Sequence, residues 1–160
     1  MSLDLFMTTI SWLGSLYVLL PAAALLSGAL ALTGRWRDSV VLWLGLGLTS
    51  IIVHLAKLLF RRPRPEAFDL LVAMPADWSF PSAHTAQAAA FFGFIAIIAS
   101  RELTASWAGP VILGCALIVT GVGWSRVYLQ VHYLSDVLAG GLVAVIVLAA
   151  LQRFLPHLLR

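Results

Sequence analysis

Apolar side chains form long, nearly uninterrupted runs along this chain, and short polar stretches separate them. An α-helix needs about 20 apolar residues to cross a hydrocarbon core of about 30 Å. By that measure the pattern predicts about five transmembrane helices, and the expected fold is all-α, an integral-membrane helical bundle. The five expected segments lie within residues 5–32, 39–60, 83–99, 106–124 and 133–154.

The first segment is long for a single crossing, and Pro21 lies inside it. A membrane helix tolerates proline as a kink. Two alternatives stay open: one crossing kinked at Pro21, or an interfacial helix followed by a crossing. Asp4 is the one charged side chain ahead of the apolar run, so we do not expect a cleaved signal peptide.

Composition agrees with a membrane protein, because 61% of the residues are hydrophobic and 11% are charged. The 160 residues fit one transmembrane domain over 1–160, with no room for a separate water-soluble domain. The net charge is +3, but the basic residues are scattered among apolar segments, which argues against nucleic acid and favours membrane lipids as partners. The single cysteine, Cys115, excludes an intramolecular disulfide.

The polar residues near the helix ends are expected to meet on one side of the membrane. With five crossings, the breaks at 61–81 and 126–132 share one side, and those at 34–38 and 101–104 share the other. Charge close to hydrocarbon is costly and usually serves a function. Three polar clusters therefore meet on the first side, at residues 57–65, 81–84 and 125–136.

The number of lysines and arginines does not indicate which side is cytoplasmic, because each side has five. The first side carries Lys57, Arg61, Arg62, Arg64 and Arg126. The second side carries Arg35, Arg37, Arg101, Arg153 and Arg160.

The residue types in the three clusters suit a phosphate group. Pro81-Ser82-Ala83-His84 begins a helix, where Ser82 can serve as N-cap and the free N–H groups of the first turn can bind an anion. Lys57, Arg64 and Arg126 add an ammonium and two guanidinium groups, which grip phosphate oxygens well.

Two histidines supply candidate chemistry in this pocket. His132 and Asp136 are spaced i,i+4, so on a helix the carboxylate accepts the proton of one imidazole nitrogen and leaves the other as a nucleophile. His84 is placed to protonate the leaving oxygen and then to activate water. The scheme needs no metal and no other cofactor. The acidic residues show no spacing typical of a two-metal site: Glu66, Asp69, Asp77 and Asp136.

Other polar residues have simpler interpretations. We interpret His54 as a packing or hydrogen-bonding residue of a membrane helix and His157 as interfacial. Arg61 and Arg62 are expected to contact lipid headgroups. The segment 66–80 is semi-amphipathic and is expected to lie on the interface as a lid.

Three ordered motifs resemble the type 2 phosphatidic acid phosphatase (PAP2) superfamily, in its bacterial integral-membrane branch. They are Lys57, six residues, Arg64-Pro65; then Pro81-Ser82-Ala83-His84; then Ser125-Arg126, five residues, His132, three residues, Asp136. The resemblance implies that His132 is the nucleophile, His84 the acid and base, and Asp136 the orienting carboxylate. It implies phosphate binding by Lys57, Arg64, Ser82, the backbone N–H of Ala83, and Arg126.

The resemblance further implies metal-independent hydrolysis of a lipid phosphate or pyrophosphate at the outer face of a bacterial cytoplasmic (inner) membrane. Undecaprenyl pyrophosphate, phosphatidylglycerol phosphate and phosphatidic acid all fit as substrates. Once the phosphate-binding cations are set aside, Arg61 and Arg62 stand against five arginines on the other side, and the positive-inside rule agrees with an external site.

Two features depart from the family pattern. Ala83 stands where relatives usually have glycine, which excludes a strongly positive φ but keeps the backbone donor. Integral-membrane relatives commonly have six crossings, whereas five are expected here. The shortfall lies before the first motif, so the catalytic core is expected to be intact.

Two other functions would also use a phosphate-binding pocket of this kind. A non-enzymatic lipid-phosphate binder or transporter would use the same cations, but it would not need His84, His132 and Asp136 together. A vanadate-dependent haloperoxidase uses a similar pocket, but those relatives are large and soluble. The residues therefore favour a lipid phosphatase.

Overall fold

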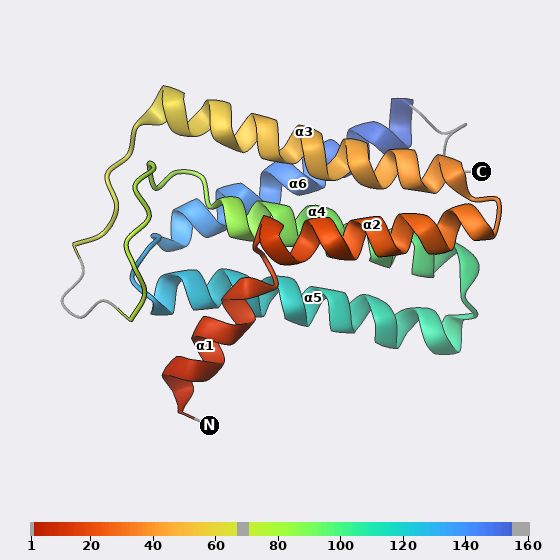
Figure 1. Cartoon of the computed structure of the whole chain (residues 1–160), viewed down its shortest axis with the longest axis horizontal. Helices are drawn as coiled ribbons and strands as arrows, with labels where there is room; N and C mark the ends of the chain where they lie inside the picture. Colours follow the sequence, from red (N-terminus) through yellow and green to blue (C-terminus); the bar gives the residue numbers. More distant parts are fainter. Residues whose placement is uncertain (1, 67–70, 155–160) are drawn as a thin grey trace.

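Six helices make up the fold in the computed structural model, which describes residues 2–66 and 71–154. They run roughly along a common axis, except for the first, which diverges from the others (Figure 1). The all-α prediction is confirmed. The helices are α1 (Leu3–Trp12), α2 (Leu16–Leu32), α3 (Trp36–Phe60), α4 (Ala83–Glu102), α5 (Ala105–Tyr128) and α6 (Leu134–Phe154).

Helices α3, α4, α5 and α6 are each long and apolar enough to cross a membrane. Helix α1 has 10 residues, about 15 Å at 1.5 Å per residue, and is too short to cross alone. Together α1 and α2 pass as one span bent by 50°. The prediction of about five crossings is therefore confirmed when this bent pair is counted as one.

The bend in the first span lies at residues 13–15, between α1 and α2, so a kink at Pro21 is the wrong alternative. Pro21 lies within α2, which continues past it. The bend brings Gly14 against the start of α4, where a Cβ would lie 2.6 Å from the backbone oxygen of His84. Glycine allows the chain to pass there, and the Ser15 hydroxyl caps α2 by accepting a hydrogen bond from Tyr17 N at 3.3 Å.

Helix α4 lies at the centre of the bundle and contacts α2, α3, α5 and α6 (Figure 1). Its small side chains explain this position, because alanine lets neighbouring backbones approach closely. Ala86, Ala88 and Ala90 of α4 are each at most 1% exposed. On the facing helix α6, Gly140 lies so close to the Ser82 carbonyl that any side chain there would collide with it.

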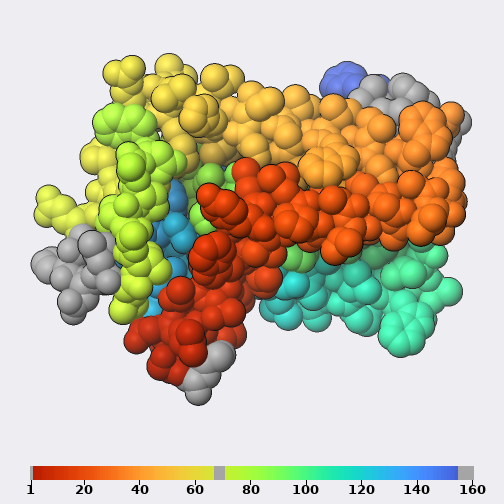
Figure 2. Space-filling view, in the orientation of Figure 1, coloured from red at the N-terminus to blue at the C-terminus, as the bar shows by residue number. Residues whose placement is uncertain are grey.

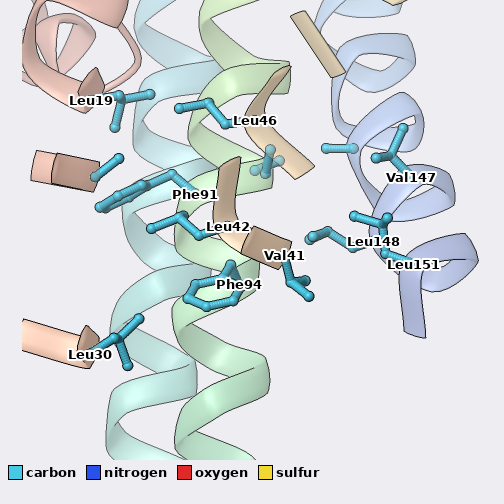
Figure 3. Packing of buried hydrophobic residues seen from close by; sticks show 14 residues of the cluster. Leu19, Leu30, Val41, Leu42, Leu46, Phe91, Phe94, Val147, Leu148 and Leu151 are labelled. Carbon is cyan, nitrogen blue, oxygen red and sulfur yellow. The ribbon is translucent and has the colours of Figure 1, made fainter. Parts of the chain in front are cut away.

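Two aromatic residues of α4 anchor the hydrophobic core. Phe91 and Phe94 lie among leucines of α2 and α3, such as Leu19 and Leu42, while α6 adds its own aliphatic side chains (Figure 3). Apolar burial of this kind fixes the helices against one another. The start of α4, where the predicted phosphate site lies, is therefore held by a packed core.

The two ends of the bundle carry different groups. The long connection 61–82 and the turn 129–133 lie at one end, and the turns 33–35 and 103–104 lie at the other (Figure 1). This is the grouping that the alternation of crossings predicted. At the second end, Arg35 joins the two turns, because it pairs with Asp38 at 2.8 Å and Glu102 at 3.2 Å.

Candidate active site

A pocket of about 290 Å³ lies at the end of the bundle that carries the long connection. Figure 2 shows the hollow beside the segment 71–80, drawn in yellow-green, next to the red helices α1 and α2. Six of the eight predicted site residues line it: Lys57, Arg64, Ala83, His84, Arg126 and His132. The other two, Ser82 and Asp136, are fully buried and do not line the pocket.

His132 lies in the turn ahead of α6 rather than on the helix itself, so the expectation of a helical pair is wrong. Gln130 adopts a left-handed conformation with φ 57°, which reverses the chain, and His132 N donates to Arg126 O at 3.2 Å. The expected contact nevertheless forms, because His132 Nδ1 lies 3.4 Å from Asp136 Oδ2. The ring is buried and its Nε2 lies 3.3 Å from Arg64 Nη1.

The carboxylate of Asp136 is 0% exposed and is surrounded by donors. Oδ1 accepts a hydrogen bond from Arg62 Nη1 at 2.8 Å. Oδ2 accepts from Tyr133 N at 3.0 Å and from the Ser79 hydroxyl. Such donors compensate the cost of burying a charge and fix the orientation of the carboxylate beside His132.

Arg62 lies at the predicted site and pairs with Asp136, a contact that the expected role at lipid headgroups did not include. Besides Asp136, it donates to Ser135 Oγ at 2.7 Å, and its guanidinium lies 4.0 Å from the centroid of the Tyr133 ring. Its carbonyl accepts from Ser79 N at 2.9 Å. Sequence spacing gave no signal for Arg62 or Ser79, because both act through contacts with α6 that only the fold creates.

Lys57 and Arg64 share a carboxylate that the sequence did not single out as a site residue. Lys57 Nζ lies 3.1 Å from Asp77 Oδ2, and Arg64 Nη2 pairs with Oδ1 of the same group. Arg64 Nε also donates to the Asp77 carbonyl at 2.9 Å, and Lys57 donates to the Trp78 carbonyl. An anion thus already lies between two of the predicted phosphate ligands.

Burial and neighbouring charges at the pocket shift the pKa values of two groups that lie outside the helices, Asp77 and His132. Burial would raise the pKa of Asp77, but hydrogen bonds from Arg64 and Lys57 outweigh it and lower that pKa. Burial lowers the pKa of His132 to about 4, and the nearby cations act in the same direction against the hydrogen bond to Asp136. The His132 imidazole is therefore neutral at physiological pH.

Arg126 is held by a residue of the N-terminal helix. Its Nη1 donates to Ser11 Oγ at 2.6 Å, although 115 residues separate the two in sequence. Arg126 is 5% exposed, and its Nε has no hydrogen-bond partner among the described residues. A buried donor of this kind is suited to an incoming acceptor.

Ser82 is the N-cap of α4, as predicted, but its side chain does not make the expected hydrogen bond to a backbone N–H. Its Oγ instead accepts from Thr85 Oγ1 at 3.0 Å. Ala83 is the first helical residue, and the non-glycine residues with positive φ in the described part of the chain are Arg61 and Gln130. Alanine at position 83 therefore fits the backbone without strain.

The described part of the expected lid, residue 66 and residues 71–80, is not helical, and 71–80 lies beside the pocket. Pro75 and Asp77 contribute to the pocket lining. The rest of that segment, 67–70, lies outside the described residues, as does His157.

Comparisons with known proteins agree with this geometry. The family model described as PAP2 superfamily matches residues 38–159, which include all three motifs. Phosphatidylglycerophosphatase B of Bacillus subtilis is 30% identical over 136 residues, 84% of this chain and 66% of the relative. Decaprenylphosphoryl-5-phosphoribose phosphatase of Mycobacterium tuberculosis is 37% identical over 117 residues, 72% of this chain and 60% of the relative.

Two further similarities cover nearly the whole chain. Undecaprenyl-diphosphatase BcrC of Bacillus subtilis is 29% identical over 157 residues, 90% of this chain and 76% of the relative. The crystal structure of a transmembrane PAP2-type phosphatidylglycerolphosphate phosphatase from Bacillus subtilis superposes with a TM-score of 0.87 at 30% identity, covering 97% of this chain and 77% of that one.

The chain spans 66% and 60% of the first two relatives, so the match covers their shared part and not their full length. The match to the family model, residues 38–159, contains every motif residue identified from the sequence and extends over most of the chain. The protein belongs to the PAP2 superfamily, as a multi-pass membrane member.

Proposed function

We propose that this protein hydrolyses a lipid phosphomonoester or pyrophosphate through a covalent phosphohistidine on His132. The position of His132 carries the proposal: Nδ1 faces the Asp136 carboxylate, and Nε2 lies 3.3 Å from Arg64 Nη1. A phosphate oxygen bound by that guanidinium would bring phosphorus next to Nε2. The relatives named as lipid phosphatases give independent support.

In the first step Nε2 of His132 attacks phosphorus and the bond to the leaving oxygen breaks. His84, which lines the same pocket, gives its proton to that oxygen. Asp136 accepts the hydrogen bond of Nδ1–H and stabilises the positive charge that develops on the ring. The products of the step are the free lipid alcohol, or lipid phosphate, and phosphohistidine.

In the second step His84 takes a proton from water, and the hydroxide attacks phosphorus. The bond between phosphorus and Nε2 breaks, inorganic phosphate leaves and neutral His132 is restored. Lys57, Arg64 and Arg126 stabilise charge on the equatorial oxygens in both transition states, together with the backbone N–H of Ala83 at the start of α4. Ser82, which is buried, occupies the N-cap of that helix instead of lining the pocket. Side chains supply every proton transfer and every balancing charge, so the scheme uses no metal.

The lipid substrate is proposed only as a class. Relatives carry the names of a phosphatidylglycerophosphatase, a decaprenylphosphoryl-5-phosphoribose phosphatase and an undecaprenyl-diphosphatase. These lipids share a terminal phosphate and long hydrocarbon chains. Phosphatidylglycerol phosphate, phosphatidic acid and undecaprenyl pyrophosphate are all members of this proposed class.

We place the pocket on the outer face of the cytoplasmic membrane. Lys57, Arg64 and Arg126 line the pocket and Arg62 braces Asp136, which leaves Arg61 as the one cation at that end, among described residues, without a part in the site. The opposite end carries Arg35 in the turn before α3, Arg37 in the first turn of α3 and Arg101 in the last turn of α4. The positive-inside rule then favours a cytoplasmic location for the second end.

Removal of either histidine tests the chemistry. Phosphate release from a panel of lipid phosphates by the purified protein is expected to fall at least about 10³-fold in His132→Ala and about 10²-fold or more in His84→Ala. EDTA should leave wild-type activity unchanged, and so should the control Ser100→Ala at the far end of α4. Retained turnover in His132→Ala would exclude the phosphohistidine, and loss in EDTA would exclude metal independence.

The protonation of His132 gives a second expectation. Because its folded-state pKa is lowered to about 4, the imidazole should stay neutral as pH falls through 6.5 and gain its proton only near pH 4. NMR titration of protein labelled at histidine, with the signal assigned by its loss in His132→Asn, measures this directly. A titration midpoint near 6.5 would contradict the buried position of the His132 ring beside Arg64 and Asp136.

Substitution of Arg62 tests whether this residue positions Asp136 or binds the substrate. Arg62→Ala should lower kcat by about tenfold or more with little change in KM, because Arg62 contacts Asp136 and not the pocket. Arg62→Lys should recover part of the loss. Arg61→Ala is the matched control, since Arg61 is an exposed neighbour, and it should change neither constant. A rise in KM alone in Arg62→Ala would instead assign Arg62 to lipid headgroups.

Cysteine labelling tests the orientation. In a Cys115→Ala background, Arg61→Cys should react with a membrane-impermeant maleimide added to intact cells, whereas Ser100→Cys should react only after the cells are permeabilised. The opposite pattern would place the pocket in the cytoplasm.

A further inference from the structure

Next to the phosphate pocket, a groove of about 390 Å³ extends along α3 and α4 into the membrane-spanning part of the bundle. The groove and the pocket share five lining residues, so the two spaces adjoin: Leu16, Lys57, Asp77, Ala83 and Gln87. A lipid whose phosphate lies in the pocket would therefore place the groups next to its phosphate in this groove.

Polar side chains line the groove at a depth where hydrocarbon is expected. Ser50 and His54 precede Lys57 by seven and three residues on one face of α3, and Gln87 follows Ala83 by one turn on α4. At about 1.5 Å per residue, polar groups continue for about 10 Å beyond Lys57. Leu16, Ile51 and Leu55 form apolar walls beside them.

These polar groups have little to bind within the protein. Gln87 is 8% exposed, and its Nε2 reaches Ser50 Oγ only at 3.4 Å. His54 is exposed and lines the groove, so of its two expected roles, packing and hydrogen bonding, only hydrogen bonding suits this position. Donors and acceptors facing a groove within a membrane-spanning segment point to a polar ligand, because they would otherwise be left without partners in hydrocarbon.

We infer that Ser50, His54 and Gln87 form a subsite for a polar linker, a polyol with its phosphodiester, that separates the terminal phosphate from the hydrocarbon chains of the substrate. The inference rests on the proposed lipid phosphatase activity and narrows its substrate class. A glycerol bridge followed by a phosphodiester extends over a length comparable to this polar part of the groove. A lipid without this linker, such as phosphatidic acid, would instead place its acyl ester groups and then methylene groups against these three side chains.

Two lipids with the same acyl chains provide the test, because phosphatidylglycerol phosphate contains such a linker and phosphatidic acid does not. The full-length protein in nanodiscs should show the higher kcat/KM on phosphatidylglycerol phosphate. In His54→Leu/Gln87→Leu the ratio of the two kcat/KM values should fall about tenfold, the effect expected from the loss of one or two hydrogen bonds. His54→Gln, which keeps a donor and an acceptor, should retain most of the ratio.

Ile51→Ala is the matched control, because Ile51 lines the same groove with an apolar side chain and should keep the ratio within about twofold. Since Gln87 is buried and its replacement can impair folding, the exposed His54→Leu is measured alone as well. An unchanged ratio in these variants, or a wild-type preference for phosphatidic acid, would overturn the subsite while leaving the phosphatase intact. Failure of the wild type to hydrolyse either lipid would overturn the proposed function itself.

Discussion

Burying the Asp136 carboxylate without access to water is unfavourable unless donors surround it. The donors come from three separate places in the chain: Arg62 and Ser79 at the two ends of the long connection, and Tyr133 at the start of α6. A hydrogen bond from Ser79 N to Arg62 O joins the two ends of this connection. The position of the long connection, of α6 and of the His132 ring thus depends on satisfying one buried charge.

The helical bundle supplies the fixed frame for this arrangement. Phe91 and Phe94 pack α4 into the core, and the small face of α4 lets Gly14 and Gly140 bring neighbouring backbones against its first turn. The site therefore lies at the end of α4 that these two glycines approach. Its cations come from α3, α5 and the long connection, so they converge only when the whole bundle is assembled.

Features that depend on local composition could be predicted from the sequence. Helix length follows from apolar runs, and the motif residues reach one end of the bundle because consecutive crossings alternate. The bend at residues 13–15 could not be predicted, because it depends on the approach of Gly14 to the His84 carbonyl. The same holds for Arg62, whose partner Asp136 lies 74 residues away, and for Ser11, which holds Arg126. Spacing within a motif carries no information about such distant pairs.

Asp77 gives the resting pocket a charge balance of its own. Its carboxylate already pairs with Lys57 and Arg64, so under the proposed function a phosphate bound by these two cations would compete with the Asp77 carboxylate. The net affinity for phosphate would then be the difference between two ionic contacts. The same two cations also donate to the carbonyls of Asp77 and Trp78, which couples the position of this loop to the site. By thermodynamic linkage, any change that strengthens these loop contacts would weaken phosphate binding by the same free energy.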